Sequence, residues 1–137
     1  MGSILVCRLL FVMMVETNEG VDYGCVTLLL TDSTTGALEV QSKTGDWIKA
    51  DPIAGAFVVN IGDMIEQWTN GEWKSTLHRV IHNGSQYRVS VPFFFEPNFD
   101  AKVKPLKPCV DRTGGTPLFK EVMYGDHLIG KIKGNFY

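Results

Sequence analysis

The chain has little net charge, no long apolar run and no paired cysteines. Its net charge of −2 gives no basic footprint of the kind that nucleic-acid binding needs. The apolar stretch at residues 4–15 is interrupted by Arg8 and is shorter than the about 20 residues that cross a bilayer. Cys7, Cys25 and Cys109 form no C-x-x-C pair, so a disulfide framework or zinc knuckle is not expected. We therefore expect no nucleic-acid or membrane partner, and a reducing, cytoplasmic compartment.

The composition of the 137 residues is that of an ordinary globular domain, with 45% apolar and 20% charged residues. Turn signals recur about every eight to twelve residues, a spacing typical of a sandwich or barrel of short strands. Residues 119–133 could form a short amphipathic helix, and residues 64–68 either a helical turn or a short strand. The predicted strands are residues 26–30, 37–41, 47–49, 56–61, 74–81 and 87–95.

Three dipeptides predict tight turns between these strands. Gly45-Asp46 joins residues 37–41 to residues 47–49. Asn70-Gly71 and Asn83-Gly84 are strong signals for two-residue hairpins. The second of these predicts that residues 74–81 and 87–95 pair as a hairpin.

Four polar side chains on the predicted strands indicate chemistry. His78 lies within residues 74–81, and Asp22 precedes the first central strand. Arg88 and Ser90 are two residues apart and therefore share a face, which hairpin pairing could make the face of His78. The planar fork of an arginine suits a carboxylate, and a serine can add a further donor. This set suggests an iron centre that also binds a small dicarboxylate.

Ordered sequence blocks carry a resemblance to a known family over roughly residues 20–100. The sequence resembles the C-terminal part of an iron(II)- and 2-oxoglutarate-dependent dioxygenase, in the branch that is similar to isopenicillin N synthase. A single block would be weak, but their order makes the resemblance specific. The blocks are DYG at 22–24, GAFVVNIGD at 55–63, TNG at 69–71, KSTLHRV at 74–80, YRVS at 87–90 and FFFEP at 93–97.

The resemblance implies a mainly β fold, the double-stranded β-helix or jelly roll, with iron at one end. It implies that Asp22 and His78 are metal ligands and that Arg88 and Ser90 bind the distal carboxylate of the co-substrate 2-oxoglutarate. The implied activity is hydroxylation or desaturation of a small organic metabolite, with decarboxylation of 2-oxoglutarate to succinate. Non-haem oxygenases of this kind use two histidines and a carboxylate and leave the remaining positions open.

The sequence departs from the family at its N-terminal side. The family motif is His-x-Asp, and here Gly20 stands where the first histidine would be. Residues 1–19 match nothing in the family and are expected to be an atypical leader that packs as a strand or helix, before a jelly-roll domain at residues 20–137. This pattern is typical of a splice form or a mispredicted gene, with a jelly roll that is incomplete at its start. Missing strands expose sheet edges, through which copies of the chain could associate.

Three functions compete at this point: an active dioxygenase, an inactive relative that keeps the fold without a full iron site, and a jelly-roll binding module without redox chemistry. The ordered blocks argue against the binding module, and Gly20 favours the inactive relative for this polypeptide. No catalytic residue beyond the ligands is predicted. His82 and His127 are interpreted as surface residues.

Overall fold

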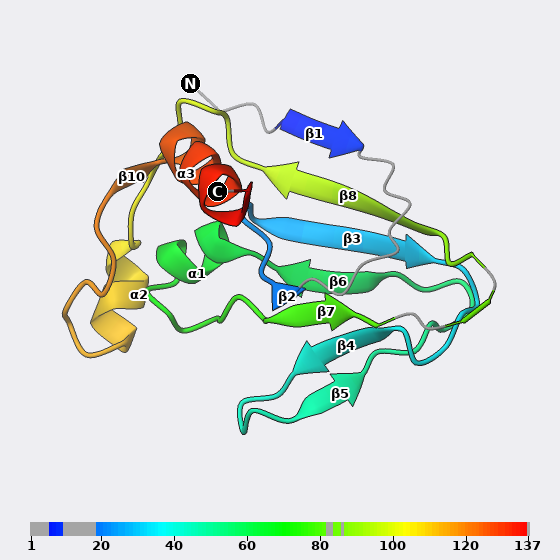
Figure 1. Ribbon diagram of the computed structural model, residues 1–137. Helices are drawn as coiled ribbons and strands as arrows, with labels where there is room; N and C mark the ends of the chain where they lie inside the picture. The colour runs from blue at the N-terminus through cyan, green and yellow to red at the C-terminus, as the bar shows by residue number, and fades with distance from the viewer. Residues whose placement is uncertain (1–5, 10–18, 82–83, 86, 137) are drawn as a thin grey trace.

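The computed structural model describes residues 6–9, 19–81, 84–85 and 87–136, and shows two four-stranded antiparallel sheets that face each other (Figure 1). The strand order is β1-β8-β3-β6 in the first sheet and β2-β7-β4-β5 in the second, and β9 pairs with β10. The mainly β prediction is confirmed. The elements are β1 (Val6–Leu9), β2 (Glu19–Gly20), β3 (Val26–Thr31), β4 (Leu38–Gln41), β5 (Trp47–Lys49), β6 (Val58–Ile61), α1 (Asp63–Trp68), β7 (His78–Val80), β8 (Ser90–Glu96), β9 (Lys102–Val103), α2 (Lys107–Arg112), β10 (Val122–Met123) and α3 (Tyr124–Phe136).

The first sheet is built around β3, which pairs with β8 on one side and β6 on the other. Its side chains alternate between the two faces, as those of any strand do. Thr27 and Leu29 point into the space between the sheets, whereas Leu30 is 47% exposed on the outer side. The central position predicted for residues 26–30 is therefore confirmed.

In the second sheet, β4 and β5 form the predicted hairpin, with Val40 opposite Ile48. The turn closes with the backbone N–H of Ser42 donating to the carbonyl of Asp46 at 2.8 Å. Gly45 has a φ of 91°, a conformation that glycine adopts without strain.

The predicted hairpin of residues 74–81 and 87–95 is wrong. Strand β7 pairs with β2 and β4 in the second sheet, whereas β8 pairs with β1 and β3 in the first. The chain thus crosses from one sheet to the other between these strands, and the inferred turn residue Asn83 lies outside the described residues, as does His82. Alternation along a strand fixes which residues share a face, but it does not fix the partner strand.

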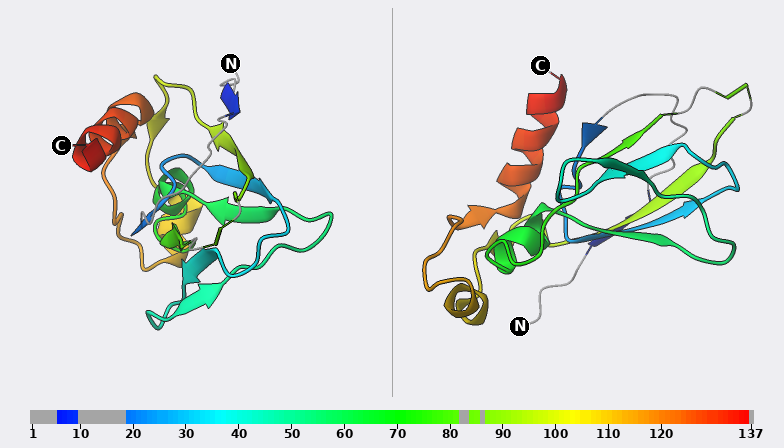
Figure 2. Two further views of the ribbon diagram at one scale, coloured as in Figure 1. Left: turned by 45° about the vertical axis from the view of Figure 1, so that its right-hand side comes forward. Right: turned by 90° about the horizontal axis from the view of Figure 1, so that it is seen from below.

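One end of the sandwich is closed by a buried core. Cys25, Met64, Val103 and Tyr124 are each at most 2% exposed and pack together. Figure 2 shows α1 and α3 gathered at this end of the sheets in both views. The short C-terminal helix predicted from the sequence is confirmed as α3, and residues 64–68 are helical as part of α1.

The interpretation of His127 as a surface residue is wrong. Its side chain is 15% exposed, and its Nε2 lies 3.1 Å from Asp63 Oδ2, at the start of α1. Lys131 Nζ lies 2.9 Å from the same oxygen. These contacts attach α3 to α1, because one buried carboxylate binds two side chains from successive turns of α3.

The Asn70-Gly71 hairpin prediction is also wrong. Both residues have positive φ, 54° and 78°, as in a hairpin turn. They instead end α1, because the N–H of Gly71 donates to the carbonyl of Glu66 at 2.8 Å, as in a helix C-terminal cap. The fully buried Asn70 side chain then donates to Thr113 Oγ1 and accepts from the N–H of Leu118. It thereby holds the segment after α2.

No helix in the described ranges is long and apolar enough to cross a membrane. The predicted leader at residues 1–19 falls mostly outside these ranges. Within it, Val6–Leu9 forms β1 and pairs antiparallel with β8, from Val6 opposite Glu96 to Leu9 opposite Phe93.

Candidate metal and dicarboxylate site

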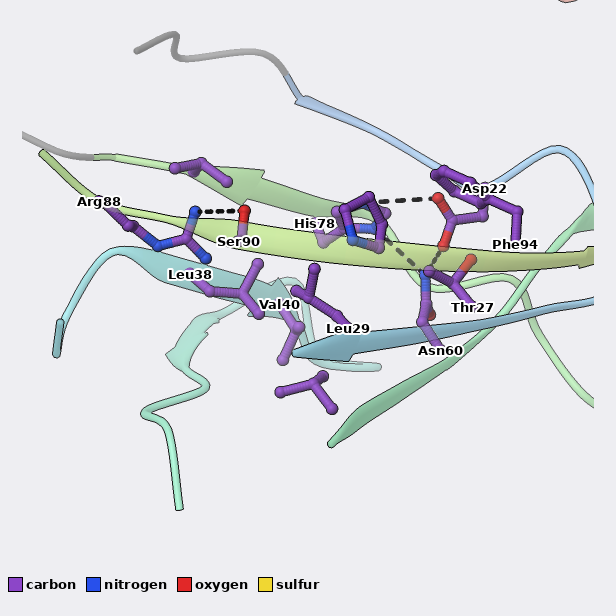
Figure 3. A pocket seen from close by; sticks show the side chains of 13 residues that line it. Asp22, Thr27, Leu29, Leu38, Val40, Asn60, His78, Arg88, Ser90 and Phe94 are labelled. Atoms are coloured by element: carbon purple, nitrogen blue, oxygen red, sulfur yellow. Dashed lines mark hydrogen bonds and ion pairs between the residues drawn. The ribbon is translucent and has the colours of Figure 1, made fainter. Parts of the chain in front are cut away.

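A cavity of about 220 Å³ lies between the two sheets. Most of its wall is apolar, and the polar side chains sit at two separate places (Figure 3). Arg88 and Ser90 lie at one end, and Asp22, His78 and Asn60 lie at the other. A cavity of this size is below the about 300–1,000 Å³ of drug-sized ligand pockets and suits a small ligand. The apolar lining residues are Leu29, Leu38, Val40, Val58, Val80, Pro92 and Phe94.

Asp22 and His78 lie close together at one end of the cavity (Figure 3). Asp22 follows β2 and precedes β3, and His78 is the first residue of β7. The distance from His78 Nε2 to Asp22 Oδ1 is 4.0 Å, and the side chains are 28% and 16% exposed. The predicted pair is thus brought together, half-buried and directed into one cavity, by segments 56 residues apart in the sequence.

A backbone carbonyl determines which ring nitrogen of His78 carries the proton. The ring Nδ1 lies 3.1 Å from the Thr76 carbonyl oxygen, which can only accept a hydrogen bond. The proton of the neutral ring is therefore on Nδ1, and the lone pair of Nε2 is directed toward Asp22. The Asn60 amide nitrogen also lies 3.4 Å from Nδ1, but the Thr76 contact is shorter and decides the tautomer. A neutral imidazole held in this way is the form that binds metals.

Asn60 was not predicted from the sequence and lies at the centre of this end. Its Nδ2 donates to Asp22 Oδ2 at 2.6 Å. One carboxylate oxygen thereby accepts a hydrogen bond, and the other, Oδ1, lies on the side of His78. The available signal was strand alternation: Asn60 is two residues from Val58, so the two share the inner face of β6, and an amide among apolar residues there needs a partner.

Arg88 and Ser90 form the second polar end, on and just before β8. Arg88 is 5% exposed, and its guanidinium donates to Ser90 Oγ at 3.3 Å. Burial lowers the pKa of Arg88, and the distant carboxylate of Asp32 only partly opposes this. Among the described residues, no ion pair forms with Arg88. A buried guanidinium without a paired carboxylate has the chemistry to bind an anionic ligand, because an unpaired charge is costly to bury.

The donor set fits a metal cation held by two protein side chains. Nε2 and Oδ1 are 4.0 Å apart, so with metal–ligand bonds of about 2.1 Å both could bind one cation after a small adjustment of the side chains. The described residues contain no group of three or more His, Cys, Asp and Glu that could hold a metal. Imidazole and carboxylate together suit a divalent first-row ion, whose other ligands would come from outside the described residues.

The chain matches a family of oxygenases. Residues 12–97 match the family described as the 2OG-Fe(II) oxygenase superfamily, so the expectation that residues 1–19 match nothing in the family is wrong for residues 12–19. Homoarginine-6-hydroxylase 2-ODD-233 of rice is 52% identical over 115 residues, which cover 84% of this chain and 35% of the rice protein. The 2-oxoglutarate-Fe(II) type oxidoreductase hxnY of Emericella nidulans is 36% identical over 125 residues, 88% of this chain and 36% of that protein. The chain thus spans about a third of the length of these relatives.

Solved structures give the same fold. The dioxygenase for auxin oxidation from rice superposes with a TM-score of 0.77 at 32% identity, over 87% of this chain and 40% of that one. A full-length Neurospora crassa protein in complex with alpha-KG and 5-formyluracil superposes with a TM-score of 0.74 at 32% identity, over 84% of this chain and 38% of that one. The jelly-roll prediction is therefore confirmed for the part of the chain that these structures cover.

Proposed function

We propose, since the chain belongs to the 2OG-Fe(II) oxygenase superfamily, that its pocket binds iron(II) through Asp22 and His78 and binds 2-oxoglutarate through Arg88 and Ser90. Iron(II) and 2-oxoglutarate are the cofactor and co-substrate of this family. Within it, we assign the chain to the branch similar to isopenicillin N synthase, with Gly20 at the position of the first metal-binding histidine.

The single observation that carries this proposal is the two-ended pocket. A guanidinium and a hydroxyl lie at one end and a carboxylate and an imidazole at the other, with apolar side chains between (Figure 3). A dicarboxylate would suit this arrangement: Arg88 and Ser90 would hold one carboxylate, and Asp22 and His78 would hold a cation at its other end, with the apolar lining between them. Neither end alone would select a dicarboxylate over other ligands.

In this scheme, the residues of the chain bind the metal and the co-substrate and orient them. Arg88 and Ser90 fix the far carboxylate of the co-substrate, and Thr76 and Asn60 hold the two metal ligands in place. When bound, iron(II) and 2-oxoglutarate activate dioxygen, so that one oxygen atom can enter a substrate C–H bond while 2-oxoglutarate loses CO₂ to give succinate. The mostly apolar wall limits the access of water to that chemistry.

The substrate we propose is a small organic metabolite. The support is that relatives are named for such substrates, homoarginine for the rice protein and feruloyl CoA for an Arabidopsis thaliana ortho-hydroxylase that is 41% identical over 108 residues. The substrates in those names differ widely, and the chain spans at most 36% of these relatives. We therefore propose a class of substrate and no individual compound.

A second candidate is an inactive relative that keeps the fold. The observation that favours it is the set of two protein ligands, because the described residues offer no third His, Cys, Asp or Glu beside Asp22 and His78. A cation with two protein ligands dissociates more readily than one with three. In this case the pocket would bind 2-oxoglutarate through Arg88 and Ser90 without turning it over.

Anaerobic titration with iron(II) and 2-oxoglutarate tests the proposal. We expect a weak visible metal-to-ligand charge-transfer band, and succinate formation when oxygen is added together with a substrate. His78→Ala should show neither, and Gly20→His should show the band at lower iron. Absence of the band at millimolar iron in the wild-type chain, with a band in Gly20→His, would favour the inactive relative. Absence of the band in both would refute the metal site.

Three further properties belong to the same proposal. We take residues 20–137 as one domain in a reducing, cytoplasmic compartment. The buried free thiols of Cys25 and Cys109 support the reducing compartment.

Copies of the chain should associate weakly through the sheet edges. Support comes from Val59, which is 61% exposed on the edge strand β6. Light scattering over a range of protein concentrations tests this, and a constant monomer mass would refute it.

A further inference from the structure

The strand position directly opposite His78 holds a glycine. Strand β2 pairs with β7 so that Gly20 and His78 are register partners. Side chains of directly opposed residues lie on the same face of a sheet, with Cβ atoms about 4.5–5.5 Å apart. Since His78 lines the cavity, a side chain at position 20 would project to the same side. Asp22, two residues further, also lines the cavity, in agreement with this alternation.

The space at this position is open. A Cβ built on Gly20 meets no described atom within 4 Å. Other glycines of the same region are fixed by packing: a Cβ on Gly62 would lie 2.5 Å from the carbonyl oxygen of Gly24, and one on Gly24 would lie 2.8 Å from a Glu96 carbon. Gly20 also has no positive φ. Neither packing nor backbone conformation therefore requires glycine at position 20.

Solvent can reach this space. Strand β2 is at the edge of the second sheet, since β7 is its only partner in the order β2-β7-β4-β5 of the described strands. Gly20 itself is partly exposed. Among the described residues, nothing on the outer side of β2 stands between this space and solvent.

We propose that the space beside Gly20 is a binding position for a small neutral nitrogen donor from solution, such as imidazole, which completes the metal site of Asp22 and His78. This inference rests on the proposed function, because it needs a cation between those two residues. The donor would occupy the volume of a side chain that glycine lacks. Metal affinity would then depend on a molecule that the chain does not supply.

Charge favours a neutral donor over an anion. A divalent cation, the carboxylate of Asp22, the guanidinium of Arg88 and a dianionic co-substrate sum to no net charge. A further anion would leave the pocket with a net negative charge, and an unbalanced charge is costly in a mostly apolar cavity. An azole nitrogen donates a lone pair without adding charge, as His78 does.

Cobalt(II) titration of the full chain, followed by the visible absorption of the bound metal, tests the inference without relying on activity. The titration is run with 2-oxoglutarate present, at increasing imidazole. For the wild-type chain we expect the cobalt dissociation constant to fall at least tenfold. Gly20→His should bind cobalt tightly and show no such gain. Gly20→Val, which fills the space with an apolar group suited to a strand, should bind like the wild type without imidazole and gain nothing from it.

The remaining outcomes show whether the binding of imidazole or the metal site itself is wrong. An equal gain in the wild type and in Gly20→Val would mean that imidazole binds elsewhere on the metal, and would overturn the inference alone. No gain in the wild type, with cobalt bound, would do the same. Cobalt binding by Gly20→His alone, at every imidazole concentration, would also overturn it. Absence of cobalt binding in all three proteins would refute the metal site itself.

Discussion

At the anion end of the pocket, Arg88 and Ser90 are two residues apart on one segment, and Arg88 is almost fully buried. At the metal end, Asp22, Asn60 and His78 come from three segments that belong to different strands or loops. The anion end carries the positive charge of Arg88, which forms no ion pair among the described residues. The metal end has donors that are already held by neighbours, but only two of them face a shared point. The proposed co-substrate end is therefore formed by one local segment, while the proposed metal end is assembled by the fold and, among the described residues, is open on the side of Gly20.

The largest expected effect is at the metal end. His78→Ala removes one of two protein donors, and we expect cobalt(II) affinity to fall by at least ~100-fold, more than the tenfold to 100-fold cost of losing an outer-shell partner. Absorption titration measures this. His127→Ala is the matched control, because that histidine contacts Asp63 outside the pocket. Equal loss in both variants would show that His78 acts through folding.

Arg88→Ala tests the anion end alone. We expect 2-oxoglutarate affinity to fall about 100-fold, close to 3 kcal/mol, because a buried charged partner is lost. Metal affinity without 2-oxoglutarate should not change. Calorimetry of the metal-loaded protein measures both. Arg112→Ala, which removes an exposed arginine paired with Glu72, should leave both affinities unchanged, and undiminished 2-oxoglutarate binding by Arg88→Ala would contradict the two-ended pocket.

Asn60→Ala tests whether Asn60 positions the carboxylate of Asp22. Loss of the hydrogen bond to Asp22 Oδ2 frees the carboxylate to rotate, and we expect metal affinity to fall about tenfold. The control is Thr27→Val, which removes a polar group at the residue opposite Asn60 on β3 and nearly keeps its volume. If cobalt titration gives the same affinity for Asn60→Ala as for the wild type, Asn60 does not position Asp22.

The closed end of the sandwich is expected to affect folding stability and to leave metal binding unchanged. Burial raises the pKa of Asp63, but hydrogen bonds from His127 and Lys131 outweigh it and hold the pKa below its usual 3.8. The ionised carboxylate therefore stabilises the fold above that value, and this contribution is lost as pH falls through the lowered pKa. Asp63→Asn should cost about 2 kcal/mol at pH 7 and less at pH 2, with unchanged cobalt affinity.

Urea unfolding at both pH values checks this prediction. An equal cost of Asp63→Asn at pH 7 and pH 2 would show that packing, and not the charge of Asp63, attaches α3 to α1. A loss of cobalt affinity in the same variant would show that the closed end and the pocket are coupled.

Local sequence signals predicted the elements more reliably than their partners. Alternation placed Arg88 and Ser90 on one face, and the apolar run at residues 26–30 identified the central strand. The hairpin of residues 74–81 and 87–95 was wrong because the two strands belong to facing sheets. His78 and Arg88 still line one cavity, because facing sheets and paired strands can both direct side chains to a common space.

The residues that the sequence did not reveal depend on contacts between distant segments. Asn60 was read only as part of an apolar strand, and its partner Asp22 is 38 residues away. Asn70 carries a hairpin signal, yet its fully buried amide bonds to the segment at residues 113–118. A dipeptide specifies its own φ angles but not the element that precedes it. His127 was assigned to the surface because its partner Asp63 lies 64 residues earlier.

The most direct test of the pocket is anomalous diffraction at the iron edge from crystals grown anaerobically with iron(II) and 2-oxoglutarate. The account predicts one iron peak bonded to Asp22 Oδ1 and His78 Nε2, and a dicarboxylate whose far end contacts Arg88 and Ser90. An iron peak away from both ligands, or a dicarboxylate bound with Arg88 turned outward, would contradict it.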